Sequence, residues 1–167
     1  SPAFPTGAFA YSHGLEWAID SRTVHDAATL KDWIADLVTR GSGWNDAVLF
    51  ARCWEEDAAS LNELALALAT SRERHLETSQ LGRAFRIAAG VFTPAVLDDE
   101  EIAYPVAAGS ACAAMGIGRH DALLAYLQGF AATLTSVAVR LVPIGQTAGL
   151  EVRSEERRVG KECRTVC

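Results

Sequence analysis

The sequence predicts an all-α fold, and three features lead to that prediction. The chain has 167 residues, half of them apolar, which is enough for one domain with its own core. Alanine is abundant while runs of β-branched residues are short and few, and this balance favours helix over sheet. The stretch 121–141 is apolar on nearly every side, as is typical of a helix enclosed by others. We therefore expect a single bundle-like domain of about seven helices around this central helix.

The central stretch has a helical pattern and no formal charge between Asp121 and Arg140. Its large apolar residues recur at spacings of three and four, which places them on one helical face: Leu123, Leu127, Phe130, Leu134, Val137 and Leu141. A membrane span is the alternative, but about 20 residues is a marginal length, and no basic flank or aromatic belt accompanies it. We expect a core helix that begins after a cap at 119–121 and stops before Pro143.

The first third of the chain predicts three helices. We expect the first over 12–20, with Ser12 as its N-cap. The second is expected over 29–40, where Thr29 and Asp32 have the spacing of a capping box, and Gly41-Ser42-Gly43 ends it. The third is expected over 44–57, capped by Asn45 or Asp46, with Glu55-Glu56-Asp57 as a solvated turn.

Three further helices are expected before the central stretch. Ser60 to Glu63 resembles a capping box and opens a helix that runs to about Arg74. The next contains Gly82, which suggests close packing, while His75 and Glu77 read as a solvated pair. Pro94 and the acidic run 98–101 indicate an exposed loop. Tyr104-Pro105 then starts a helix of small residues that ends at Gly116 and Gly118.

Charge and motifs exclude several functions. The formal net charge is −6, which argues against binding of nucleic acid. No charged leader with an apolar core is seen, so we expect no signal peptide. The chain has no H-E-x-x-H, G-x-S-x-G, P-loop or dinucleotide motif. Cys53 and Cys112 are expected to be small buried residues. These patterns favour a binding protein over an enzyme.

One pair of residues leaves a metal site open. His13 and Glu16 are three positions apart, so both could face the same side of a helix and ligate a metal. A helical metal-binding protein or metalloenzyme that uses this pair is therefore the alternative function. A hydrogen-bonded surface pair, or a polar contact with another protein, explains the same spacing, and we favour the contact with another protein.

The last residues break the composition of the chain. Five of the 15 basic residues lie within 153–167. The string RSEERRVGKEC at 153–163 resembles the translation of a sequencing-library adapter. We expect the natural sequence to end near Val152 and the tail, 153–167, to be non-native and disordered, so we draw no chemistry from Cys163 or Cys167.

Four segments, SPAFPTGAFAYSHGLEWAI (1–19), ETSQLGRAF (77–85), YPVAAGSACAAMGI (104–117) and LVPIGQTAGL (141–150), carry a family resemblance. In this order and at this spacing they resemble the UreF family of urease accessory proteins. The first and last segments are the specific ones. The sequence departs from the family pattern at Ala8, Ala10 and His13. The resemblance covers nearly all of 1–152, which we expect to be one UreF-like domain, truncated at both ends relative to the family.

The resemblance implies an all-α cytoplasmic protein that has no catalytic activity and binds no cofactor tightly. Family members dimerise, bind an accessory protein of the UreD (UreH) type, recruit the UreG-type GTPase and help to deliver nickel to apo-urease. The assembled complex handles the nickel. No contact with nucleic acid or membrane is implied. Together with His13, the residues expected to contact partners are Pro5, Gly7, Phe9, Tyr11, Ser12, Gly14, Glu16, Pro143, Gly145, Gln146 and Gly149. Trp17 is expected either in the core or at such a contact.

Overall fold

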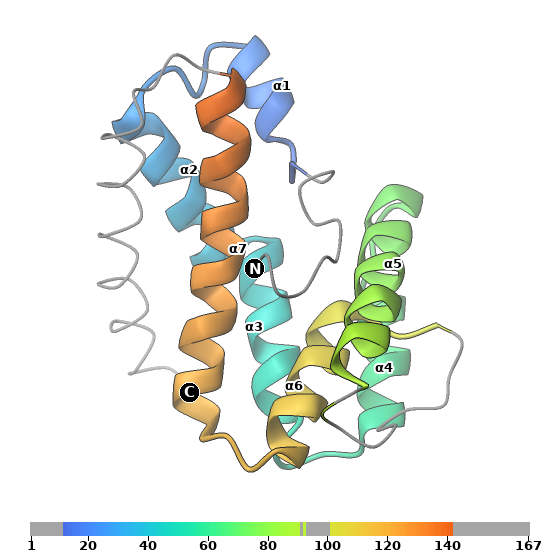
Figure 1. Ribbon diagram of the computed structural model, residues 1–167. Coiled ribbons are helices and arrows are strands. Elements are labelled where there is room, and N and C mark those ends of the chain that lie inside the picture. The colour runs from blue at the N-terminus through green and yellow to red at the C-terminus, as the bar shows by residue number, and fades with distance from the viewer. Residues whose placement is uncertain (1–11, 91, 93–100, 142–167) are drawn as a thin grey trace. The chain divides into compact units, whose positions relative to one another are not determined.

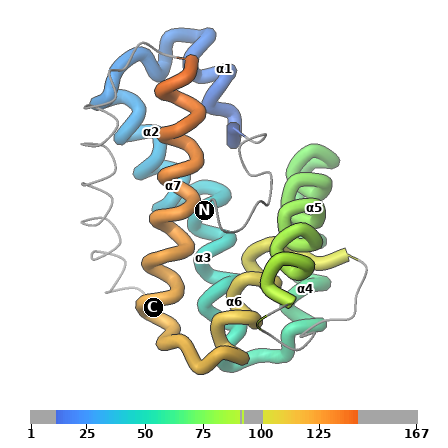
Figure 2. Tube along the Cα trace, viewed as in Figure 1, coloured from blue at the N-terminus to red at the C-terminus, as the bar shows by residue number. Residues whose placement is uncertain are grey.

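The structure, a computed structural model, describes residues 12–90, 92 and 101–141. These residues form seven helices and no strand, so the predicted all-α fold is confirmed (Figure 1). The helices, in chain order, are α1 (Leu15–Asp20), α2 (Ala27–Arg40), α3 (Ser42–Arg52), α4 (Ala58–Ala67), α5 (Arg72–Ala89), α6 (Tyr104–Ala114) and α7 (Arg119–Leu141). Figure 2 traces their order along the chain.

The described residues divide into two compact units. One contains Asp46–Leu123, and the other contains 12–45 together with 124–141. The boundaries fall inside α3 and α7, so each of these helices contributes residues to both units. The two units are described separately below.

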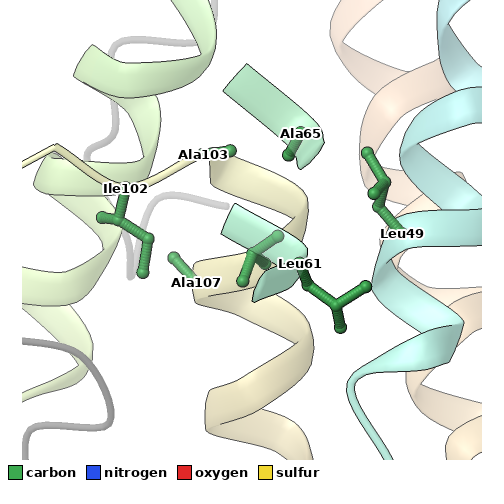
Figure 3. Packing of buried hydrophobic residues seen from close by; sticks show 7 residues of the cluster. Leu49, Leu61, Ala65, Ile102, Ala103 and Ala107 are labelled. Carbon is green, nitrogen blue, oxygen red and sulfur yellow. The ribbon is translucent and has the colours of Figure 1, made fainter. Parts of the chain in front are cut away.

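The core of the Asp46–Leu123 unit is built around α6, which packs against α5 and α4. Seven consecutive residues of α6, from Pro105 to Ala111, are all buried. They can be enclosed on every side because most of them are small. A buried cluster joins the start of α6 to α3 and α4 (Figure 3), and its members are Leu49, Leu61, Ala65, Ile102, Ala103, Val106 and Ala107.

Polar side chains hold the segment before α6 in place. The Asn62 side chain donates to the carbonyl oxygen of Glu101 (2.9 Å) and accepts from the backbone N–H of Ala103 (2.8 Å). Thr78 accepts a hydrogen bond from the N–H of Tyr104 at 3.1 Å. The buried Asn62 therefore satisfies backbone groups that would otherwise lose their hydrogen bonds to water.

A buried ion cluster links α3 and α5 in the same unit. The Arg74 guanidinium lies 2.6 Å from the Asp46 carboxylate and 3.0 Å from the Glu77 carboxylate. Burial disfavours the charged guanidinium, but the two carboxylates outweigh it and raise the pKa of Arg74 above its ordinary value. The expectation that Glu77 forms a solvated pair with His75 is therefore wrong, since Glu77 is buried against Arg74.

The core of the second unit is formed by the apolar sides of amphipathic helices. Leu30, Ile34 and Val38 of α2 recur every four residues and are buried, as the sequence pattern predicts. In α7 the expected inward residues Leu127, Leu134 and Val137 are buried. Leu141, expected on the same face, is half exposed and lies at the end of the helix.

Helix α7 is long and apolar enough to cross a membrane by length and composition alone. Only 39% of its most apolar window is buried within the structure. Core helices of soluble proteins pass the same test, so this one helix is weak support for a membrane span. Helix α7 is therefore not enclosed on nearly every side as expected, whereas α6 is.

Several predicted helix starts are wrong because a different residue caps each helix. The N-cap of α1 is Gly14, which has no side chain to accept a hydrogen bond, and not Ser12. Asp26 caps α2 with Thr29 as its partner, and Asp57 caps α4 by accepting from the Ser60 N–H at 2.9 Å. Helix α3 begins at Ser42, before the expected caps Asn45 and Asp46. Helix α4 ends at Ala67, and Ser71 caps α5. Helix α7 begins at Arg119.

The two described cysteines are free and half-buried. Burial raises the pKa of the Cys53 and Cys112 thiols, which keeps them protonated near neutral pH. Both therefore fit the predicted role of small apolar residues.

Candidate partner-contact site

The site is organised by a tight turn before α1. His13 (φ 49°) and Gly14 (φ 77°) both adopt the left-handed conformation. The turn is closed by hydrogen bonds from Leu15 N–H to the Ser12 carbonyl (2.9 Å) and from Ala18 N–H to the Gly14 carbonyl (3.0 Å). The left-handed region costs a non-glycine residue roughly 1 kcal/mol, so His13 must be held there by its neighbours.

Two residues far away in the sequence hold His13. Its Nδ1 lies 3.1 Å from the hydroxyl of Ser42, the first residue of α3. Its ring lies 4.8 Å from the Phe130 ring of α7, centroid to centroid, at an interplanar angle of 55°. Gly43 leaves the room that Phe130 needs, because an added Cβ there would lie 3.1 Å from that ring. The half-buried His13 is thus a structural clamp for the turn.

Helix α1 has one buried side and one exposed side. Leu15 and Ala18 are fully buried, whereas Glu16, Trp17 and Asp20 are exposed. Trp17 is 68% exposed, which rules out the expectation of a core role within this structure. Exposed tryptophans are costly in water and are over-represented among residues that anchor protein interfaces.

A buried donor without an acceptor lies beneath the turn. The Trp33 indole N–H of α2 is buried and has no hydrogen-bond partner among the residues that the structure describes. The Trp33 ring lies against Gly14, since an added Cβ on Gly14 would be 3.7 Å from its Cζ2 atom. Leaving such a donor unpaired costs about 1–3 kcal/mol. Backbone strain at His13 and this unpaired donor therefore occur in the same place, beside the exposed side of α1.

The structure describes four of the predicted contact residues, Ser12, His13, Gly14 and Glu16, and places them in this one turn and helix. The other eight lie outside the described residues: Pro5, Gly7, Phe9, Tyr11, Pro143, Gly145, Gln146 and Gly149. Sequence reasoning missed Ser42, Phe130 and Trp33. No local pattern could have found Ser42 and Phe130, because they are 29 and 117 positions from His13.

The geometry does not favour a metal site at His13 and Glu16. Nδ1 of His13 is taken by Ser42, and Glu16 extends from the exposed side of α1. No group of three or more histidine, cysteine or carboxylate side chains that could hold a metal occurs in residues 12–90, 92 and 101–141. What this site presents is an exposed aromatic side chain, Trp17, on a helix with a buried opposite side, with carboxylates beside it.

Comparisons with known proteins show the family of this chain. The family model of UreF matches residues 24–157. A urease accessory protein UreF of Methylorubrum populi is 46% identical over 91% of this chain and 74% of its own length. Proteins of the same name from Cereibacter sphaeroides and Brucella ovis are 48% and 47% identical over 92% and 88% of this chain, and 73% and 68% of their own lengths. The chain therefore belongs to the UreF family of urease accessory proteins, a non-enzymatic family whose members assist urease.

Proposed function

We propose that this protein is a scaffold in the assembly that inserts nickel into urease. In this role it binds an accessory protein of the UreD (UreH) type, recruits the UreG-type GTPase and acts on apo-urease in the cytoplasm, as a homodimer within the complex. Nickel is cargo of the assembled complex, and the isolated chain needs no tightly bound cofactor. Membership in the UreF family supports the general role as a urease accessory protein.

The exposed side of α1 is the proposed contact with the first of these partners. The single observation that carries this assignment is Trp17, a large aromatic residue 68% exposed on a helix whose other side is fully buried. A rigid support lowers the entropy lost when an anchor side chain binds, because the anchor is already held in position. The clamp of His13 by Ser42 and Phe130 provides that support.

The test is a titration of the purified UreD-type partner into the chain and its variants, followed by calorimetry. We expect Trp17→Ala to weaken binding at least about tenfold, the loss that corresponds to about 1.4 kcal/mol. Leu68→Ala is the matched control, since it removes a half-exposed apolar side chain at the end of α4, outside α1 and outside the four segments that resemble the family. Its affinity should equal that of the original chain, and circular dichroism should be unchanged in both variants.

The same titration can be followed through the fluorescence of Trp17. The chain has four tryptophans, so the signal of Trp17 is the difference between the original chain and Trp17→Ala. Free Trp17 should be quenched readily by iodide because it is exposed, and binding of the partner should protect it. If the chain binds none of the UreD-type protein, the UreG-type GTPase and apo-urease, the proposed function is wrong. If it binds but Trp17→Ala has no effect, only the assigned contact is wrong.

A further inference from the structure

The segment 77–85 resembles the family pattern, but the contact site described above leaves it without a role. This segment lies in α5, and its residues divide between two sides of the helix. Thr78, Leu81 and Gly82 are buried against the rest of the unit. Gln80 and Arg83 are exposed. The inward residues have a packing role, which leaves the outward ones to be explained.

The outward residues belong to a longer stripe. Starting from Arg72, exposed residues recur along α5 at spacings of four, four, three and four, so they lie on one side of the helix. We call this surface the α5 outer stripe, and it consists of Arg72, Leu76, Gln80, Arg83 and Ile87. Its ends are separated by 15 positions, or about 22 Å along the helix axis.

The stripe exposes more apolar surface than a solvated helix needs. Leu76 is 49% and Ile87 66% exposed, and the two lie three turns apart on the same side. Single exposed apolar residues are common on protein surfaces. Two large ones aligned along one helix, with Gln80 and Arg83 between them, have the pattern of anchors for a partner surface.

The charge of the stripe indicates what kind of partner fits. Its five residues include two arginines and no carboxylate, with the exposed Glu73 at its edge, although the chain as a whole has a formal net charge of −6. Among the described residues, neither Arg72 nor Arg83 forms an ion pair, whereas Arg74 on the buried side is paired twice. Unpaired arginines beside exposed apolar residues suit a partner whose surface is apolar at its centre and acidic around it.

We propose that the α5 outer stripe is a docking surface for an acidic face of another protein. The inference rests on the proposed function, since that protein is then one of the partners of this chain in urease maturation. A second copy of this chain fits less well. If a two-fold contact ran the two copies of α5 antiparallel, it would place Arg83 opposite Leu76 and Arg72 opposite Ile87. If it ran them parallel, it would place arginine opposite arginine, so neither arrangement supplies the acidic groups that the arginines would pair with.

The experiment measures affinity for each of the three purified partners, the UreD-type protein, the UreG-type GTPase and apo-urease, at low and high salt. The chain is compared with Arg83→Lys, Arg83→Gln and Arg83→Glu. We expect one partner to bind Arg83→Lys nearly as well as the original chain, Arg83→Gln less tightly, and Arg83→Glu about tenfold or more weakly. The difference in affinity between the original chain and Arg83→Glu should be smaller at high salt, because salt screens the charges.

A second pair of variants tests the apolar part. Leu76→Ala removes a stripe residue, and Leu68→Ala removes a side chain of equal exposure, 49%, that lies at the end of α4 and off the stripe. Leu76→Ala should weaken binding of the same partner, and Leu68→Ala should not. All variants should keep their helix content, because each altered side chain is exposed.

The outcomes separate this inference from the proposed function. A chain that binds none of the three partners overturns both. A chain that binds them, while the Arg83 series and Leu76→Ala bind as tightly as the original, overturns only the stripe. If light scattering shows that these variants change the oligomeric state but leave every partner affinity intact, the occupant is a second copy and the proposal is wrong.

Discussion

Gly82 shows how a single missing methyl group fixes a packing distance. In α5 this glycine lies against the backbone of the segment before α6, and an added Cβ would overlap the carbonyl oxygen of Ile102. A backbone atom cannot move aside as a flexible side chain can. The close packing that the sequence suggested for Gly82 is therefore confirmed.

We predict that Gly82→Ala destabilises the protein by about 3 kcal/mol, since overpacking against backbone outweighs the gain of about 1 kcal/mol in helix propensity. Gly129→Ala is the matched control, because Gly129 is also helical but has open space where its Cβ would be. That variant should gain up to about 1 kcal/mol. Urea unfolding followed by circular dichroism measures both. Equal effects of the two substitutions would contradict this account.

Two aspartates at helix starts make the stability of α2 and α4 depend on pH. Asp26 caps α2 and Asp57 caps α4, and both are exposed. Hydrogen bonds from the Thr29 N–H and side chain lower the pKa of Asp26, and those from the Ser60 N–H and side chain lower the pKa of Asp57. The charged form is thus favoured in the folded chain.

We predict that this contribution is present above about pH 4, the ordinary range of aspartate, and is lost as the pH falls through the lowered values. The unfolded chain binds protons first, so stability must rise with pH in that window. Asn caps helices without titrating. The melting temperature of the double variant Asp26→Asn, Asp57→Asn should therefore change less with pH than that of the original chain between about pH 2 and 5. Circular dichroism measures both melting temperatures. An unchanged slope would refute the assignment.

The helices themselves could be predicted from the sequence, whereas their starts could not. Apolar spacing placed α2 and α7 correctly because the pattern extends over several turns. Caps depend on one or two residues, and Thr29 and Ser60 fit equally well as caps or as partners of a preceding aspartate. The surrounding turn decides between them: the Thr29 hydroxyl also accepts from the N–H groups of His25 and Asp26.

The candidate site was predictable only in part for a related reason. The family resemblance indicated the segment that contains His13 and Glu16, but not which side chains face outward. Trp17 looked equally suited to the core, and only the burial of Leu15 and Ala18 on the other side shows that it is exposed. The support of His13 by Ser42 and Phe130 is a contact over long sequence distances, which no local pattern encodes.

At the scale of the whole molecule, the most apolar helix is not the most deeply buried one. The most apolar long helix, α7, is buried on one side, while α6 has seven consecutive residues removed from solvent. Small side chains allow α5 and α4 to pack closely around it. They also allow α3 to approach α6 closely, since an added Cβ at Gly109 would lie 2.7 Å from the carbonyl oxygen of Phe50 in α3.

The enclosure of α6 has a consequence for the rate at which its peptide hydrogens are replaced in heavy water. An amide can exchange only when its hydrogen bond opens, and opening α6 requires the helices around it to separate first. We predict that peptides covering Val106 to Ala111 take up deuterium more slowly than those from the exposed end of α7, as mass spectrometry would measure. In this molecule the last protons to leave should come from the run 107–111 of α6, which contains only alanine, glycine and serine.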